Sequence, residues 1–247
     1  MAAKMMFIDT SKCIGCRACQ VACKQWHNLP AETTTFTGKY TNPSDLSANT
    51  LTLVNFTEYQ SDKLSFLFFK KQCMHCNRAV CKKRCPTGVE KTTEGFVVFN
   101  ANCTPENVRI TRVDKKFYFG NKNYVPTPAE VIQFFLDGCP YHVPRYDSVN
   151  NKFVKCDFCY DRFHGGKYTT YNSEGKPTTA CQLTCPTGAI TTGTKGEIYS
   201  LAQQRLRAAK REGHRGAGLW GGRGRVVYLL TEYRQNYDLG LKPCGMD

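Results

Sequence analysis

The chain has 247 residues, of which 41% are apolar, and it carries 15 cysteines. This length can bury a core in one large domain or two smaller ones, and no apolar run reaches the roughly 18 residues of a membrane span. The formal net charge of +14 suggests nucleic acid or an anionic membrane surface as a partner. Anionic metal clusters would cancel part of this charge, so it is weak evidence for nucleic acid. An odd number of cysteines in close C-x2-C pairs argues against a disulfide framework.

The elements predicted along the chain are short and separated by loops. Residues 28–50 are rich in Thr, Asn and Pro and predict a long surface loop. A turn is expected at Gly120-Asn121. Apolar runs of strand length predict strands over 6–9, 50–59, 63–69, 95–99, 107–113, 115–119 and 225–233.

Two helices are predicted from their termini. Residues 127–130, Thr-Pro-Ala-Glu, form a capping box with proline at the first helical position, which opens a helix over 128–137 that Gly138 ends. Residues 196–211 place their apolar side chains on one face, and Gly213 ends this second helix. The mixture of elements indicates an α+β fold.

The first cysteine motif has the spacing C-x2-C-x2-C-x3-C. Ferredoxins use this spacing to hold a [4Fe–4S] cluster with three thiolates, while the fourth cysteine binds the other cluster. Lys24 stands where ferredoxins usually have proline. The motif consists of Cys13, Cys16, Cys19 and Cys23.

Two further motifs end in the repeated sequence Cys-Pro-Thr-Gly, which indicates duplicated ferredoxin modules. The last motif contains an insertion, residues 161–180, that predicts a hairpin. Cys139-Pro140 resembles the end of another motif whose first three cysteines are missing. The two complete motifs are Cys73, Cys76, Cys81 and Cys85, and Cys156, Cys159, Cys181 and Cys185.

Other interpretations of these features are weaker. Structural zinc also uses C-x2-C pairs, but it does not explain a run of four cysteines at ferredoxin spacing. The glycine- and arginine-rich residues 214–225 resemble an RNA-binding tract, although one short occurrence before a strand is more typical of a turn. The sequence has no acid–base pair or nucleophile motif, so we expect a carrier of electrons that performs no bond chemistry.

Charged residues beside the cysteines have two interpretations. A cation there either raises the reduction potential of a cluster, by stabilising its more negative reduced form, or is an ordinary surface charge. These cations are Lys24, Lys155 and Arg162. Histidines beside the motifs are expected to pack or to form hydrogen bonds, because thiols already complete each site; they are His27, His75 and His142.

Five segments resemble the iron–sulfur electron-transfer subunits of molybdopterin oxidoreductases, and most of all the β subunits of soluble molybdenum or tungsten formate dehydrogenases. The segments are CIGCRACQVACKQWHNLP, QCMHCNRAVC, GCPYHVPR, KCDFCYDR and ACQLTCPTGAI. The resemblance covers most of the chain and is weak over residues 31–50 and 165–178. It implies ferredoxin-like halves in which the first and fourth motifs, and the second and third, exchange their last cysteines.

The resemblance implies three [4Fe–4S] clusters, because the third motif retains only Cys139. Cys85 would then have no cluster to bind, and Cys103 and Cys244 are left over as a buried thiol and a tail thiol. The alternative, in which Cys85 completes its own motif and Cys139 is structural, is not excluded by spacing. The implied ligand sets are Cys13, Cys16, Cys19 and Cys185; Cys156, Cys159, Cys181 and Cys23; and Cys73, Cys76, Cys81 and Cys139.

The implied fold is α+β, with two ferredoxin-like modules, crossed cysteine motifs and long loop insertions. Residues 1–70 and 146–247 would form a module carrying two clusters. Residues 71–145 would form an inserted module with one cluster and a degenerate fourth site.

The implied partner is a molybdopterin-containing catalytic subunit in a heterodimer that oxidises formate or reduces carbon dioxide. A cytochrome or other redox acceptor would exchange electrons with the chain, and neither nucleic acid nor a membrane span is expected. The N-terminal sequence shows no export signal, so export to the periplasm would occur with the partner, and the cytoplasm is the alternative. Two other functions stay open: the same role for another molybdopterin oxidoreductase, and a free-standing polyferredoxin.

Overall fold

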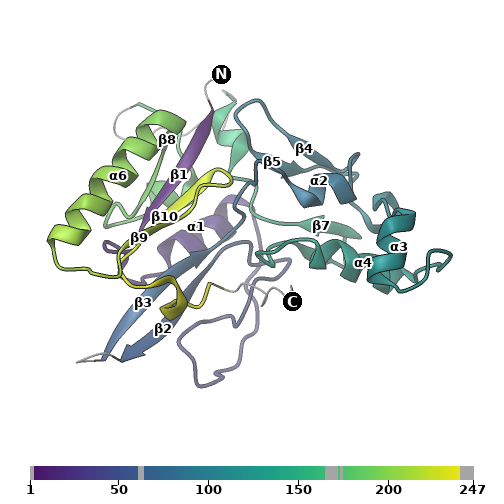
Figure 1. Ribbon diagram of the computed structural model, residues 1–247, viewed down its shortest axis with the longest axis horizontal. Coiled ribbons are helices and arrows are strands. Elements are labelled where there is room, and N and C mark those ends of the chain that lie inside the picture. The colour runs from purple at the N-terminus through teal and green to yellow at the C-terminus, as the bar shows by residue number, and fades with distance from the viewer. Residues whose placement is uncertain (1–2, 61–63, 165–171, 173–174, 240–247) are drawn as a thin grey trace.

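The computed structural model describes residues 3–60, 64–164, 172 and 175–239. Its largest sheet has four strands in the order β8-β1-β10-β9 (Figure 1). β1 runs parallel to β10 and antiparallel to β8, so strands far apart in the sequence form the centre of the sheet. The strands are β1 (Lys4–Asp9), β8 (Ile190–Thr194), β9 (Gly218–Gly221) and β10 (Val226–Leu230).

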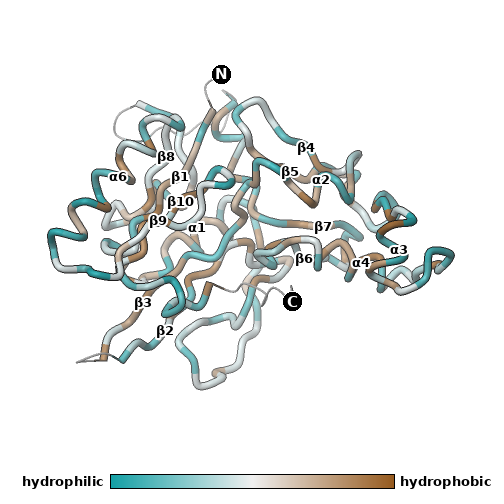
Figure 2. Tube along the Cα trace, in the orientation of Figure 1, coloured by the Kyte–Doolittle hydropathy of each residue, from teal (hydrophilic) through white to brown (hydrophobic). Residues whose placement is uncertain are grey.

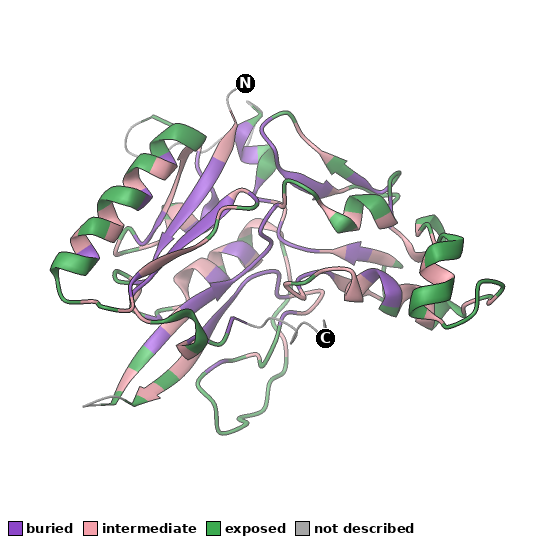
Figure 3. Ribbon diagram, in the orientation of Figure 1, coloured by how far each residue is buried: buried purple, intermediate pink, exposed green. Residues whose placement is uncertain are grey.

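The two faces of this sheet support different parts of the molecule. Met5 and Phe7 of β1 pack beneath α6 (Lys195–Arg211), whose outer side is exposed (Figure 3). Met6 and Ile8 lie on the opposite face, in an apolar cluster that also includes cysteine side chains. Successive strand residues alternate between faces, so one short strand supports both a covering helix and the cysteine motifs.

The described residues also form three antiparallel hairpins. The longest hairpin lies against the central sheet, where the Tyr228 hydroxyl donates to the Lys70 carbonyl at 2.7 Å. Figure 2 shows that apolar residues concentrate in the strands around this junction. The hairpins are β2 (Leu53–Gln60) with β3 (Leu64–Lys71), β4 (Val89–Lys91) with β5 (Val97–Phe99), and β6 (Arg145–Asp147) with β7 (Lys152–Val154).

Most of the remaining helices are short. α2, α3 and α4 gather with β4, β5 and β7 on the side of the molecule away from α6 (Figure 1). None of the helices in the described part of the chain has the length and apolar character needed to cross a membrane. The α-helices are α1 (Ala18–Trp26), α2 (Val80–Arg84), α3 (Arg112–Tyr118), α4 (Pro128–Asp137) and α5 (Ala180–Leu183), and the 3-10 helices are Pro105–Asn107, Tyr160–Phe163 and Arg234–Asn236.

The structure confirms the α+β class and most of the predicted elements. α4 begins with the predicted capping box at Thr127 and Glu130, and α6 ends before Gly213. Residues 28–50 form neither helix nor strand. Much of the hairpin predicted over 161–180 lies outside the described residues, and the division into two modules stays a prediction.

Two predicted strands are wrong. Residues 107–113 form no strand, and 115–119 lie largely in α3. Thr111 and Asp114 form a reciprocal capping box that starts this helix. Apolar residues here lack a sheet edge to pair with, so local capping decides the structure instead of strand propensity.

Candidate metal centres

The first set of thiols joins the N-terminal motif to the last cysteine motif. Cys13, Cys16, Cys19 and Cys185 line one cavity. The first two lie in the loop after β1, Cys19 lies in the first turn of α1, and Cys185 follows α5. The Cys13 thiol interacts electrostatically with those of Cys185 and Cys16. These four residues are the first set that the sequence predicts.

The second set of thiols is lined up by the packing of α1 against α5. Cys23, Cys156, Cys159 and Cys181 line a second cavity. Cys23 lies one helical turn after Cys19 and reaches a different set, since its thiol interacts with those of Cys156 and Cys181. Each of these two cavities is therefore lined by cysteines of both the first and the last motif.

The third set of thiols surrounds the largest of the three cavities, about 690 Å³ in volume. Cys73, Cys76, Cys81 and Cys139 line it. The Cys81 thiol interacts with the other three, although Cys139 comes from the far end of α4. α4 thus positions Cys139 beside the second cysteine motif, which precedes it in the chain.

Cys85 and Cys103 lie apart from these cavities. Both are fully buried, with 0% exposure, and their side chains interact with each other. They belong to an apolar cluster with Phe135 and Phe153. The geometry therefore favours Cys139 over Cys85 as a member of the third set, and apolar packing surrounds the thiol left over. Cys244 lies outside the described residues.

The three sets form a row with the second set in the middle. The Cys19 thiol of the first set interacts with that of Cys181 in the second. The Cys156 thiol of the second set interacts with that of Cys73 in the third. Adjacent sets are therefore close enough for direct electrostatic coupling.

A shared backbone bend shapes the C-x2-C loop that opens each of the three complete motifs. The second residue between the cysteines has a left-handed backbone each time, with φ of +67° at Gly15, +46° at His75 and +69° at Phe158. This conformation costs a non-glycine residue about 1–2 kcal/mol. The bend has no sequence signature, because only one of the three positions is glycine.

The chemistry of the thiols fits a metal centre. Burial raises the pKa of Cys19, Cys76, Cys81 and Cys156 to about 12. Such thiols hold their protons at neutral pH unless a metal ion replaces them. Four sulfur donors around one cavity suit iron–sulfur clusters or zinc, and the four-cysteine run favours the cluster.

Two buried lysines lie among the thiols. Lys155 is only 6% exposed, so its interpretation as a surface charge is wrong. Lys70, in β3, is 3% exposed, and its burial could not be predicted because an isolated lysine before a motif carries no signal of its own. Burial acts to lower the pKa of Lys70, but the thiolates of the first and second sets raise it above its ordinary value.

The other cations beside the motifs have partners of their own. Lys24 forms an ion pair with Glu32 at 3.2 Å, and the buried Arg162 lies 4.1 Å from the centre of the Trp26 ring. These contacts connect surface loops and helices to the cysteine motifs.

Two histidines beside the motifs form side-chain hydrogen bonds, which is one of the two roles expected for them. His27 Nε2 lies 3.3 Å from Asp157 Oδ1. The Nδ1 of the fully buried His75 accepts the Val97 N–H at 2.9 Å. These contacts orient the loops that carry the thiols.

The glycine-rich residues 214–225 contain β9 and the turn that follows it, and this turn packs against the third set. The Arg225 N–H donates to the Met74 carbonyl at 2.9 Å, and the Asn77 N–H donates to the Arg223 carbonyl at 3.0 Å. A Cβ at Gly224 would lie 2.1 Å from the Met74 carbonyl oxygen. Glycine is needed for this close approach, which gives the tract a role in the fold.

Comparison with known proteins identifies the family. Two regions match 4Fe-4S dicluster domains: residues 12–89 and 125–195. The iron–sulfur subunit of the nitrate-inducible formate dehydrogenase of Escherichia coli is 36% identical over 228 residues. That match covers 90% of this chain and 66% of the relative, so the chain spans slightly less than two thirds of the relative's length.

Two further relatives bear on the assignment. The formate dehydrogenase 2 subunit beta (cytochrome c-553) of Nitratidesulfovibrio vulgaris is 32% identical, over 95% of this chain and 96% of the relative. The formate dehydrogenase subunit beta of Megalodesulfovibrio gigas is 34% identical, over 84% of this chain and 84% of the relative. With two dicluster domains in an α+β fold, the protein belongs to the family of formate dehydrogenase iron–sulfur subunits.

Proposed function

We propose that this chain relays electrons through three [4Fe–4S] clusters between a molybdopterin-containing formate dehydrogenase subunit and an external acceptor such as a cytochrome. One observation carries the proposal: three cavities are each lined by four cysteines drawn from crossing motifs. Twelve thiolates suffice for three clusters with four ligands each. The name of the Nitratidesulfovibrio vulgaris relative, which includes cytochrome c-553, supports a cytochrome as the acceptor.

The ligand assignment is part of the proposal. Each cluster, when bound, accepts and releases one electron without bond chemistry in the protein. The thiolates fix the position of each cluster, and the row of three sets provides a relay across the molecule. The ligands are Cys13, Cys16, Cys19 and Cys185 for cluster one; Cys23, Cys156, Cys159 and Cys181 for cluster two; and Cys73, Cys76, Cys81 and Cys139 for cluster three.

Aromatic packing gives the relay a dry interior. Phe96 stacks on Phe158 with ring centres 4.5 Å apart, and Phe163 packs against both rings. Phe158 itself lies within the C-x2-C loop of the second set. Excluding water in this way protects buried thiolates and strengthens the electrostatic interactions that set reduction potentials.

Exposed apolar side chains favour a subunit over a free-standing polyferredoxin. Ile14, Val21 and Leu183 are 60%, 55% and 52% exposed; Ile14 lies in the loop of the first set, and the other two lie on α1 and α5, which carry thiols of the first and second sets. Exposed apolar surface of this kind marks protein interfaces. The proposed occupant is the catalytic subunit, which would place cluster one at the interface and cluster three toward the acceptor.

The proposed compartment is the periplasm, reached by export with the catalytic subunit, and the cytoplasm is the alternative. Cell fractionation that follows this chain together with its partner distinguishes the periplasm from the cytoplasm. Recovery of the chain in the cytoplasmic fraction of cells that export other periplasmic proteins would contradict the first choice.

The decisive experiment counts metal and sulfide in the protein isolated without oxygen together with any copurifying subunit. Three cubane clusters require about 12 iron atoms and about 12 acid-labile sulfides per chain. A copurifying molybdopterin subunit that reduces this chain when formate is added completes the test. Zinc without labile sulfide would exclude electron transfer, and about eight irons would reject the third cluster.

A further inference from the structure

Two lysines occupy the spaces between adjacent thiol sets. Lys70 and Lys155 are 3% and 6% exposed. Within the described residues, neither ammonium lies at ion-pair distance from a carboxylate, whereas the neighbouring Lys71 pairs with Asp45 at 2.7 Å. A buried ammonium without an anionic partner is strongly disfavoured, so these positions call for a negative charge nearby.

Lys70 lies between the first and second sets. It lines the cavity of the first set together with the four cysteines there. It also interacts electrostatically with Cys23, Cys156 and Cys181 of the second set. The neutral side chain of Gln72 accepts a hydrogen bond from its Nζ, which orients the ammonium without neutralising it.

Lys155 lies between the second and third sets. It lines the cavity of the third set, and its Nζ donates to the backbone carbonyls of Val97 and Cys156, the latter at 2.9 Å. It interacts electrostatically with Cys73 and Cys81 of the third set as well as Cys156 of the second. The Phe99 ring, 4.7 Å from its Nζ, closes the apolar side.

Clusters held by four thiolates would supply the missing negative charge. Such a cluster carries about two negative charges when oxidised and one more when reduced. A fixed cation therefore stabilises the reduced form more than the oxidised form, which raises the reduction potential. Asp157 also lies beside the second set and interacts electrostatically with Lys155, but it is not at ion-pair distance from that ammonium, and its carboxylate pairs with His27 Nε2 at 3.3 Å.

We propose that Lys70 and Lys155 are buried counter-charges that raise the reduction potentials of the clusters on either side of them. Both lysines face the second set, so cluster two has the highest potential of the three. An electron entering from either end then rests on the middle cluster. This inference depends on the proposed function, because it needs the three clusters to be bound.

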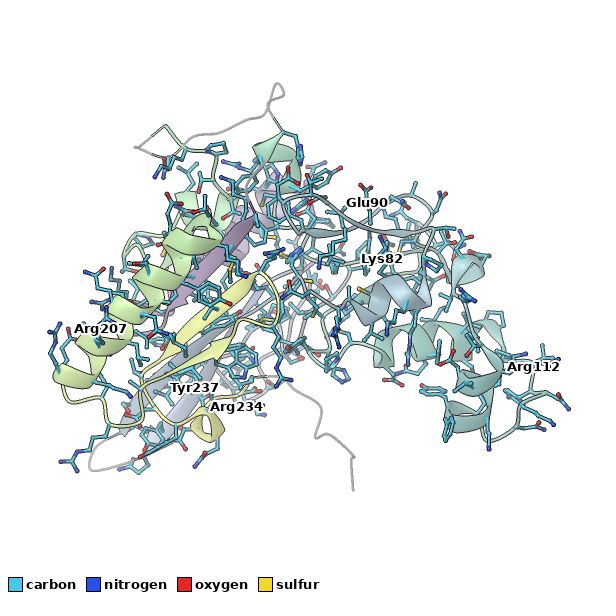
Figure 4. The ribbon with its side chains drawn as sticks, turned by 45° about the horizontal axis from the view of Figure 1, so that its top comes forward. Lys82, Glu90, Arg112, Arg207, Arg234 and Tyr237 are labelled. Carbon is cyan, nitrogen blue, oxygen red and sulfur yellow. The ribbon has the colours of Figure 1, made fainter. Side chains whose placement is uncertain are left out.

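The test compares lysine-to-methionine variants, which remove the charge and keep an apolar side chain of similar length. Lys70→Met and Lys155→Met are made in the full-length chain, with any copurifying subunit retained. Lys82→Met is the control, since Lys82 is exposed on α2, the helix beside the third set (Figure 4). Reduction of each cluster is followed by electron paramagnetic resonance during a redox titration, after iron and sulfide are counted.

Each lysine variant should lower the potential of the clusters it faces. At a fixed solution potential near the midpoint, we expect the ratio of reduced to oxidised cluster two to fall about tenfold in either variant. Lys70→Met should also lower the reduction potential of cluster one and leave that of cluster three unchanged. Lys155→Met should lower the potential of cluster three and leave that of cluster one unchanged. The control should leave all three potentials unchanged, because solvent screens an exposed charge.

Outcomes that overturn the inference are distinct from failure of the proposed function. If both methionine variants kept three clusters with unshifted reduction potentials, the proposed role of the lysines as counter-charges would be wrong. The proposed function would not be affected. A wild-type chain without iron would reject the proposed function itself. Should a methionine variant lose one cluster, its arginine counterpart decides: regained iron supports the counter-charge, and continued loss contradicts it.

Discussion

His75 Nε2 lies 3.9 Å from Cys156 Sγ, so a residue in the loop of the third set touches a thiol of the second. Its Nδ1 accepts the Val97 N–H, which leaves the ring proton on Nε2, facing the sulfur. Burial and, to a smaller extent, Lys155 hold the pKa of His75 well below its ordinary value, so the ring is neutral. One imidazole thereby links two adjacent metal centres.

Replacing this histidine tests the link. His75→Asn should lower the potential of cluster two, because asparagine is too short to donate to Cys156 but tolerates the left-handed backbone at this position. We expect a fall of a few-fold in the ratio of reduced to oxidised cluster two at fixed solution potential, roughly the effect of one charge-assisted hydrogen bond. Redox titration measures it, and a change confined to cluster three would contradict the link.

The crossed assignment predicts opposite results for two cysteines. Cys139→Ala should remove cluster three or convert it to a three-iron form, because this thiol lines the cavity of the third set. Cys85→Ala should retain all iron, since that side chain is buried among Phe135 and Phe153. Iron and sulfide per chain are measured for both variants. Iron loss in Cys85→Ala alone would support the alternative in which Cys85 completes its own motif.

The cap of α4 should influence the third cluster through Cys139. Thr127→Ala removes the hydroxyl that accepts the Glu130 N–H and should cost about 1 kcal/mol of stability. Thr194→Ala is the matched control, because it breaks an equivalent capping box at the start of α6, which packs on the other face of the sheet. Both should lower unfolding midpoints similarly. Only Thr127→Ala should speed the release of iron from cluster three.

The loop over residues 28–50 should protect the second and third sets from oxygen. Asp45 binds both Lys71 and Arg145 at 2.7 Å, and the adjacent Leu46 is buried against Cys73 and Cys156. Asp45→Asn should accelerate iron loss in air, measured as bleaching of the visible absorbance. An unchanged bleaching rate would show that Leu46 holds the loop without this ion pair.

The Asp45 contact also has a predicted pH dependence. Burial acts to raise the pKa of Asp45, but the hydrogen bond from Lys71 and the other contacts lower it below its ordinary value of 3.8. The ion pair therefore contributes its full stability above about pH 4 and loses it as the pH falls further. At neutral pH, loop protection should not vary with pH.

Sequence patterns revealed the cysteine motifs of the dicluster domains but not the surroundings of the thiols. Cysteine spacing is local, and the family resemblance supplied the crossing that joins Cys139 to the second motif. The left-handed bends at His75 and Phe158 could not be predicted, because both residues disfavour that conformation and only the completed loop enforces it. The proposed clusters would stabilise loops that carry this strain.

The burial of charged side chains could not be predicted from the sequence either. Lysine is rarely buried without a partner, so Lys70, directly after the strand predicted over 63–69, suggested no special role. The two wrong strands have the same origin in tertiary context: Val113 and Phe117 have strand propensity, but the structure leaves them 63% and 79% exposed on α3.

The place of β1 between β8 and β10 has a consequence for biosynthesis. This strand is synthesised well before both of its neighbours in the sheet. The first thiol set is likewise incomplete until Cys185 is synthesised, long after Cys13, Cys16 and Cys19. A nascent chain would therefore expose an unpaired strand edge and incomplete metal sites for most of its synthesis, a state prone to aggregation. Insertion of cluster one would then follow the synthesis of Cys185, and a chain truncated before that residue could not acquire this cluster.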